Sequence, residues 1–304
     1  MLTIHWRYFL THPRNILLAV LRMMGFLFQD KLYLKLMYCI RTSEWLDLGH
    51  PQSFGEKIQW LKLYDRRPEY TMMVDKYAVK AYVAGIIGCE HVIPTLGVWD
   101  RPEDIDFESL PQQFVLKTTH GGGGSGVVIC KNPENFHKES AIWKLRQSFK
   151  QDIYRTLREW PYKNVRKRVI AEAYLTDGNG ILVDYKIYCF NGEPKYCQVM
   201  KGRGEGMTVD FYDTEWRRMP FNGFGKHYAH ADNDMPMPGN FLEMMEMASR
   251  LSEGIPFVRV DCYQAAERVY FGELTFFPAS GFGHFEPRKW DGIMGDLIVL
   301  PSKK

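Results

Sequence analysis

Two carboxylates near the end of the chain stand at strand spacing among apolar residues. In the segment "FVRVDCYQAAERVYFGELTFF", a period of two puts Arg259 and Asp261 on one face of a strand. The same period puts Glu273 and Thr275 on one face of the next strand, and if the turn centres on Glu267, Asp261 lies opposite Glu273. Two such carboxylates form a hard oxygen site that suits Mg²⁺ carrying nucleotide phosphates, with Arg259 beside them to neutralise a phosphoryl group in transfer. The alternative is a set of solvated charges on an exposed sheet face.

A glycine-rich stretch separates two strand-like runs in "FVLKTTHGGGGSGVVIC". Five of the six residues from 121 to 126 are glycine. Gly121, Gly123 and Gly126 match G-x-G-x-x-G by count, but the strand-like "VVICK" follows where a dinucleotide-binding loop must open a helix. No G-K-[ST] ends the run, which excludes a Walker loop. The pattern predicts either a flexible surface turn or a hairpin flap whose amides close over phosphates, with Lys117 adding charge.

Composition sets the frame for these motifs. The 304 residues are 45% apolar and 25% charged, which is typical of a globular chain with room for two lobes. The net charge of +3 does not indicate a nucleic-acid partner. The six cysteines include no C-x-x-C pair and are expected to be reduced core residues rather than metal ligands. With no cleavable signal pattern, they favour a cytoplasmic location.

Helix and strand patterns place the motifs in a mixed α and β chain. Ser53 and Glu56 have capping-box spacing, so a helix is expected to begin near Ser53. A second helix is expected from about Asp75, with Lys76 and Lys80 one turn apart. Apolar patterns predict further strands at 92–99, 113–120, 126–131, 168–175, 183–190 and 193–200, helices at 133–160 and 241–254, and a long insertion at 202–240.

The stretch "NILLAVLRMMGFLF" near the N-terminus is apolar, but Arg22 interrupts it and it is shorter than the ~20 residues of a spanning helix. It is therefore not expected to cross a membrane. The segment around it is basic, with Asp30 as its single acid. Its basic residues are Arg7, Arg14, Arg22, Lys31 and Lys35. Such a helix suits peripheral contact with an anionic membrane face, and the alternative is a helix packed on the body of the protein.

The order of these residues resembles the TupA-like ATP-grasp family, which is linked to teichuronopeptide and other surface-polysaccharide biosynthesis. The segments that carry the resemblance are "FGEKIQWLKLYDR", "VDKYAVKAYV", "FVLKTTHGG", "REWPYKN", "DYKIYCFNGEPK" and "GELTFFPASGF". The resemblance implies an α+β ATP-grasp fold, in which two α+β lobes clasp ATP after a helical N-terminal region. It implies a helical region at 1–72, an N-lobe with the glycine flap at 73–168, and a C-lobe with the metal site and the insertion at 169–304.

The resemblance also implies ATP and Mg²⁺ as cofactors and assigns roles to residues. Lys76 and Lys117 would contact the α and β phosphates, Lys186 would add a cation on the phosphate side, and Arg259 would stabilise the transition state. The other positions are His120, Gly121, Gly122, Gly123, Gly124, Ser125 and Gly126 in and beside the flap, Glu172, Ala173, Tyr174 and Leu175 in the adenine hinge, and Asp261, Glu273 and Thr275 at the metal. Thr275 stands where the family usually has asparagine, and since a hydroxyl is the weaker ligand, a second Mg²⁺ would be held loosely. Without the resemblance, Lys186 also fits a strand-surface charge and Glu172 an edge residue.

ATP-grasp enzymes typically phosphorylate a carboxylate and let an amine attack the acyl phosphate. The resemblance therefore implies a ligase that joins an amino acid or peptide to a uronic acid of a surface polysaccharide or its lipid-linked precursor, at the inner face of the membrane. His284 and Ser280 in "PASGFGHFEP" are candidates for the acceptor pocket. Within the insertion, Arg203, Arg217 and Arg218 could pair with a uronate carboxylate.

Two other functions remain open from the sequence. The same site could transfer phosphate to a sugar hydroxyl and stop there, as a glycan kinase does. The chain could also be a non-catalytic glycan-binding protein of polysaccharide biosynthesis, although the presence of Lys117, Asp261 and Glu273 argues against a decayed site.

Overall fold

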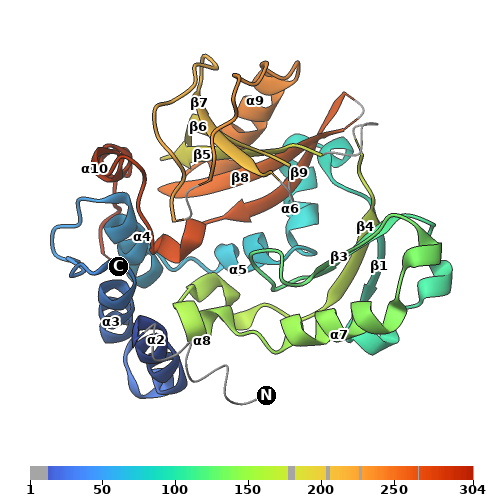
Figure 1. Ribbon diagram of the computed structural model, residues 1–304, viewed down its shortest axis with the longest axis horizontal. Coiled ribbons are helices and arrows are strands. Elements are labelled where there is room, and N and C mark those ends of the chain that lie inside the picture. Colours follow the sequence, from blue (N-terminus) through green and yellow to red (C-terminus); the bar gives the residue numbers. More distant parts are fainter. Residues whose placement is uncertain (1–12, 177–181, 203–205, 226–227, 266, 304) are drawn as a thin grey trace.

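The computed structural model describes residues 13–176, 182–202, 206–225, 228–265 and 267–303 (Figure 1). Arg7 and Arg203 lie outside the described residues. The α-helices are α2 (Pro13–Met23), α3 (Asp30–Thr42), α4 (Phe54–Tyr64), α5 (Glu69–Val74), α6 (Val79–Ile87), α7 (Lys138–Phe149), α8 (Ile153–Leu157), α9 (Phe241–Ser252) and α10 (Lys289–Asp296). Short 3-10 helices include η1 (Gly25–Leu27), η6 (Trp160–Asn164) and η7 (Pro278–Gly281).

The larger sheet has five antiparallel strands in the order β7-β6-β5-β8-β9. They are β5 (Asp184–Phe190), β6 (Glu193–Lys201), β7 (Thr208–Asp213), β8 (Phe257–Ala265) and β9 (Arg268–Thr275). Every residue of the central strand β5 is buried. Helix α9 covers one face, and aromatic rings around Phe54 of α4 cover part of the other, with the Phe54 and Phe257 ring centroids 5.0 Å apart (Figure 1). Cys197 and Cys262 lie in this sheet as buried free thiols, as expected, whereas Cys89 before β1 is exposed.

The smaller sheet has four strands in the order β1-β4-β2-β3, and helix α7 packs on it. The strands are β1 (Thr95–Trp99), β2 (Phe114–Thr118), β3 (Val127–Cys130) and β4 (Val169–Ala173). β2 and β3 form the predicted antiparallel hairpin around the glycine run. Because β4 pairs with both β1 and β2, the chain leaves this sheet only after Ala173. The lobe boundary expected between 168 and 169 therefore precedes a strand that pairs with the N-lobe.

The helix expected at Ser53 forms, and the helix expected at Asp75 begins later. Ser53 Oγ accepts from the Glu56 amide at 3.3 Å while Glu56 Oε2 accepts from the Ser53 amide at 2.9 Å, which completes the capping box. Asp75 instead uses Oδ1 to accept from the amides of Tyr77 and of residue 78. The Asp75 carbonyl also accepts from the Val79 amide at 2.9 Å, so Asp75 begins a helix-like turn that contains Lys76, and regular helix α6 starts at Val79.

Two other long segments differ from expectation. The helix expected over 133–160 is divided, because Asp152 accepts from the Arg155 amide at 2.8 Å and starts α8 as a separate helix. The stretch expected to be an insertion at 202–240 contains β7, which pairs with β6 over Thr208–Asp213 and extends the large sheet. The apolar alternation in this segment is too weak to predict the edge strand β7 from the sequence.

The N-terminal helices α2 and α3 pack on each other and on the segment around α8 (Figure 1). The hydroxyl of Tyr33 in α3 donates to the Thr156 carbonyl at 2.9 Å. Within the described ranges, no helix combines the length and apolarity needed to cross a membrane.

Candidate active site

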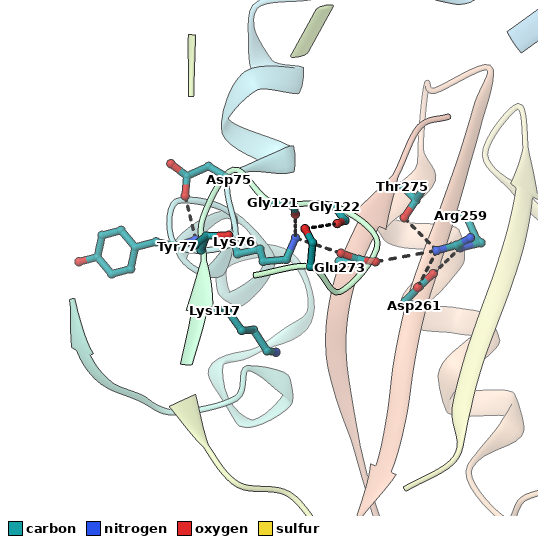
Figure 2. Close-up of polar contacts among 12 residues, drawn as sticks. Asp75, Lys76, Tyr77, Lys117, Gly121, Gly122, Arg259, Asp261, Glu273 and Thr275 are labelled. Carbon is teal, nitrogen blue, oxygen red and sulfur yellow. Dashed lines mark hydrogen bonds and ion pairs between the residues drawn. The ribbon is translucent and has the colours of Figure 1, made fainter. Parts of the chain in front are cut away.

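Strands β8 and β9 bring the two predicted metal ligands together. Asp261 pairs directly with Glu273, and Arg259 pairs with Thr275, so the register expected from the strand period is confirmed. Directly opposite residues of an antiparallel pair share a face, so these four side chains project from one side of the sheet (Figure 2). That side is the one not covered by α9.

Asp261 is buried, and two cations neutralise it. Arg259 donates from Nε to Asp261 Oδ1 at 2.6 Å and from Nη2 to Oδ2 at 2.8 Å, and the same Nη2 reaches Thr275 Oγ1 at 3.1 Å. Lys186, which lies opposite Asp261 on β5, donates its ammonium to the same carboxylate. The forked arginine and the lysine hold this buried carboxylate in a fixed orientation.

Glu273 is the more accessible of the two acids, with 37% of its side chain exposed. Burial alone would raise its pKa, but Lys76, Lys186 and Arg259 outweigh that effect and hold the pKa at about 2. Glu273 is therefore ionised across the physiological range. Two carboxylates and a hydroxyl on one face are the hard oxygen donors that Mg²⁺ takes, so this donor set fits the cation that the sequence implied.

Lys76 joins the glycine loop to the metal-ligand strand. Its Nζ donates to the Gly121 carbonyl at 2.7 Å and lies 3.2 Å from Glu273 Oε2 (Figure 2). The Lys76 amide also donates to the Thr119 carbonyl at 3.1 Å, next to the loop. One lysine thus contacts both the glycine loop and the Glu273 carboxylate.

Glu172 is a buried carboxylate held by two lysines. Lys117 of β2 lies 2.5 Å from its Oε2 and Lys80 of α6 lies 2.5 Å from its Oε1. Burial opposes ionisation, yet these two cations leave the pKa of Glu172 lowered. Ala173, Tyr174 and Leu175 follow it half-buried. Lys80 was not among the predicted site residues, although its one-turn spacing from Lys76 was a signal for it.

Residues 121–126 connect β2 to β3, and glycine is needed there for two different reasons. A Cβ at Gly121 or Gly126 would lie 2.4 or 2.2 Å from the Thr118 hydroxyl, so the two ends need glycine for space. Gly123 and Gly124 have φ of +63° and +77° with no neighbour within 4 Å of an added Cβ, so the tip needs glycine for its backbone conformation. Ser125 bridges the loop to Gln151 at 3.0 Å.

His120 beside the loop is buried and structural. Its Nε2 lies 3.2 Å from the Ser148 carbonyl. Burial first, and then the charge of Lys167, lower the pKa of His120 to about 4, so the ring is neutral near pH 7 and Nε2 is the donor. The ring therefore supports the β2 end of the loop.

The predicted substrate arginines Arg217 and Arg218 pair with acids of β7 rather than with the residues around Asp261. Arg218 donates to Asp210 Oδ1 and to Asp234, and Asp210 alternates on β7 with Phe211. Phe211 pairs with Gln198 of β6, and Gln198 pairs with Lys186 of β5, so Phe211 and Lys186 lie on the same face of the sheet. Asp210 alternates with Phe211 and therefore lies, with Arg218, on the opposite α9 face, across the sheet from Asp261. Arg217 pairs with Asp213 at 2.7 Å with 68% of its side chain exposed. The structure does not bring these arginines to the metal ligands.

His284 is oriented by a carboxylate from α10. Its Nδ1 lies 2.8 Å from Asp291 Oδ2, while its Nε2 is buried without a hydrogen-bond partner among the described residues. Asp291 Oδ1 also accepts from the Phe285 amide at 2.7 Å, which fixes the carboxylate. An imidazole held this way at Nδ1 presents Nε2 as a proton acceptor.

A buried lysine that sequence reasoning missed holds the loop after β9. Lys62 of α4 is fully buried and donates to the Leu157 carbonyl at 3.0 Å and to both Ser280 O and Ser280 Oγ at 2.7 Å. The Phe282 ring centroid lies 4.6 Å away. Burial lowers the pKa of Lys62 to about 7, and the charge of Glu159 opposes that shift. The three donors of a lysine ammonium match these three acceptors, so Lys62 anchors the loop through its side chain.

The loop that Lys62 anchors has an unusual backbone. Ala279 and Ser280 have φ of 45° and 56°, a left-handed conformation that residues other than glycine adopt rarely. Ser280 also hydrogen-bonds the buried Glu159, which precedes η6. In η6, burial raises the pKa of Tyr162, and the charges of Glu159 and Glu273 raise it further. Tyr162 therefore lies close enough to both Glu159 and Glu273 to sense their charges.

Comparisons with known proteins show which family this sequence belongs to. A family model described as "TupA-like ATPgrasp" matches residues 56–299. No curated protein matches the chain. Three solved structures show how distant the structural likenesses are.

A D-alanine-D-alanine ligase from Helicobacter pylori is 16% identical with a TM-score of 0.44, over 83% of this chain and 70% of that one. The Bacillus anthracis ligase complexed with ATP is 15% identical with a TM-score of 0.39, over 67% and 54%. The ATP-grasp ligase PsnB, complexed with a precursor variant, Mg and ADP, is 13% identical with a TM-score of 0.42, over 79% and 63%. This chain thus spans between about half and 70% of their lengths, and their activities belong to those proteins.

Replacing Lys62 tests the anchored loop. We expect Lys62→Met to lower the free energy of unfolding by about 3–5 kcal/mol, because it leaves Glu159 and the Ser280 carbonyl buried without their cation. Adding Glu159→Gln should restore part of that loss. Urea unfolding measures both, with Lys144→Met on the exposed side of α7 as the control. A change in Lys62→Met no larger than in the control would contradict the buried ammonium.

Proposed function

This chain belongs to the TupA-like ATP-grasp family, and we propose that it is an ATP-dependent carboxylate-amine ligase that joins an amino acid or peptide to a uronic acid of a surface polysaccharide or its precursor. The observation that supports this most is the position of Lys76, in contact with both the glycine loop and Glu273. A nucleotide-phosphate site needs a cation between phosphate-binding backbone amides and metal-binding carboxylates, and Lys76 occupies that position here between the glycine loop and Glu273.

In the proposed mechanism the chain positions phosphates and neutralises charge. Lys76 and Lys117 bind the α and β phosphates, while the amides of residues 121–126 cover the β and γ phosphates. Asp261 and Glu273 would hold Mg²⁺, with the Thr275 hydroxyl as a weaker ligand; when bound, the ion offsets the negative charge of the phosphates. Glu172 and residues 173–175 face the adenine.

The proposed chemistry has two displacements. A carboxylate oxygen of the uronic acid attacks the γ phosphorus, the bond to the ADP oxygen breaks, and Arg259 stabilises the transferred group. The amine nitrogen then attacks the acyl carbon of the acyl phosphate, and phosphate leaves. The amine proton passes to an acceptor, for which His284 is placed by Asp291 with Nε2 unpartnered in the described structure. No protein nucleophile is required.

The substrate class rests on the resemblance set out in the sequence analysis. For the acceptor we propose the side of the sheet that carries Asp261, next to the η7 loop with Ser280 and near His284. Arg218 is engaged by Asp210 on the other side, and Arg217 by Asp213 at the sheet edge. The proposed acceptor site therefore does not depend on either arginine.

Removing either metal-ligand charge tests the core of the proposal. We expect Asp261→Asn and Glu273→Gln each to lower ADP formation by ~100-fold or more, because each removes an anionic oxygen from the cation site. Thermal melting, measured alongside, separates lost chemistry from lost folding, and Glu273→Gln is the informative variant because its side chain is partly exposed. Glu193→Gln, whose side chain is 70% exposed at the far end of the sheet, is the control. Near wild-type turnover in both site variants would remove the metal assignment.

The glycine loop gives a second test, in which binding and turnover separate. Lys117→Ala should weaken binding of a non-hydrolysable ATP analogue by roughly 10-fold, since it removes a charge-assisted contact to phosphate. Gly123→Val should mainly lower turnover, because valine strains the positive φ that the loop tip uses to close. Gly254→Val is a matched control, with φ of +69° and equally open surroundings outside the site. Calorimetry and ADP release distinguish the two effects, and normal values for both site variants would make the glycine run only a turn.

Trapping the activated carboxylate distinguishes a ligase from a kinase. With ATP, Mg²⁺ and a suitable uronate, hydroxylamine in place of the amine should give a hydroxamate in step with ADP. A kinase acting on a sugar hydroxyl would form ADP without hydroxamate. That result across a panel of uronic acids would overturn the ligase proposal, and no nucleotide binding at all would favour a glycan-binding protein.

A further inference from the structure

The N-terminal helices carry an exposed apolar surface. Between residues 16 and 32, eight large apolar side chains are exposed, including Leu17 at 55%, Met23 at 67%, Phe26 at 72% and Leu27 at 61%. We call residues 16–32 the N-terminal patch. Scattered exposed apolar residues are ordinary, but a contiguous group of this kind marks a contact surface.

Helix α2 has two apolar sides, and only one of them is covered. Leu18 and Leu21 face the body, where Leu21 is 6% exposed. Ile16, Val20 and Met23 stand at i, i+4 and i+7, so they share the opposite side and point to solvent. Packing on α3 therefore accounts for one side of the helix and leaves the other without a partner in the described structure.

The charges around the patch are positive. Arg22 and Lys31 lie within the patch and are exposed, and Arg14 is exposed one turn before it on the Leu18 side of α2. Asp30 is the single acid of α2, η1 and α3, and it faces inward, 2.6 Å from Arg66 and 2.9 Å from Arg158. The outward charge of the patch is therefore basic, and this charge identifies a negatively charged partner.

The patch is also held firmly against the enzyme body. Arg158 is buried, donates to the Gly25 carbonyl in η1 and lies 3.9 Å from the centre of the Tyr33 ring. Arg158 immediately precedes Glu159, which hydrogen-bonds Ser280 beside the metal site. A surface bound by the patch would thus be held at a fixed orientation to the active site.

We propose that the N-terminal patch docks the protein on an anionic lipid surface. Exposed phenylalanine, leucine and methionine enter the acyl-chain boundary, and arginine and lysine within and beside the patch pair with lipid phosphates, as in helices that lie in the plane of a membrane. Charge complementarity selects this partner over a neutral surface.

Vesicle sedimentation of the full chain tests the proposal. The protein should bind vesicles of phosphatidylcholine mixed with phosphatidylglycerol more strongly than vesicles of phosphatidylcholine alone, and high salt should weaken binding. Phe26→Asp with Leu27→Asp should abolish it. Arg22→Glu with Lys31→Glu should reduce it by at least about five-fold per charge removed. Leu242→Asp, at a side chain 76% exposed on α9, should bind as the wild type does.

Several results would overturn the proposal. They are absence of wild-type binding, equal binding to both vesicle types, or equal loss in the Leu242→Asp control. Concentration-dependent self-association that Phe26→Asp abolishes would instead assign the patch to a second copy of the chain. All exchanged side chains are exposed, so thermal melting should stay unchanged, and ADP release with water-soluble substrates should persist in the variants. A failure here therefore leaves the ligase proposal to its own tests.

Discussion

The structure of the site depends on neutralising carboxylates that the fold has removed from water. An isolated buried carboxylate costs several kcal/mol, roughly, and becomes tolerable only when cations and hydrogen bonds surround it. Asp261 has Arg259 and Lys186, Glu172 has Lys80 and Lys117, and Asp75 has Arg168. In each case at least one cation comes from a different element than the acid. The ion pairs therefore hold the strands and helices in fixed positions relative to one another. Those between strands form only in the observed strand register, which places Lys186 opposite Asp261.

The N-terminal helical region is part of this arrangement. Helix α4 packs Phe54 among the rings of the large sheet and sends Lys62 to the Ser280 loop, which follows the metal-ligand strand β9 within a few residues. The loop keeps two non-glycine residues at positive φ, and a buried ammonium with three acceptors stabilises that strained backbone. Removing the helices would therefore disturb the Ser280 loop, on the side that we propose for the acceptor, as well as the core.

The features that were predicted correctly from the sequence are those set by the spacing of nearby residues. A strand period of two and one turn position were enough to place Asp261 opposite Glu273, and the Ser53 to Glu56 spacing was enough to start α4. Strand order was beyond such reasoning, so the pairing of β4 with β1 and β2 was missed. For the same reason the side of the sheet that bears Arg218 was not visible in the sequence. Lys62 stands in a helix with mixed polarity, and its burial arises from the η7 loop more than 200 residues away.

In the proposed function, the paired charges would make nucleotide and metal binding support each other at this site. Lys76 lies against Glu273, and Arg259 and Lys186 lie against Asp261, so each carboxylate already has protein cations as partners. Phosphates that attract Lys76 toward the glycine loop would take a positive neighbour from Glu273. Lys76 is the main cation that lowers the pKa of Glu273 to about 2 against the effect of burial, so its withdrawal would leave this carboxylate less compensated, and a divalent cation would supply the missing positive charge. A cation bound there would in turn weaken the hold of Glu273 on Lys76 and leave the lysine to the phosphates, so each ligand lowers the electrostatic cost of binding the other.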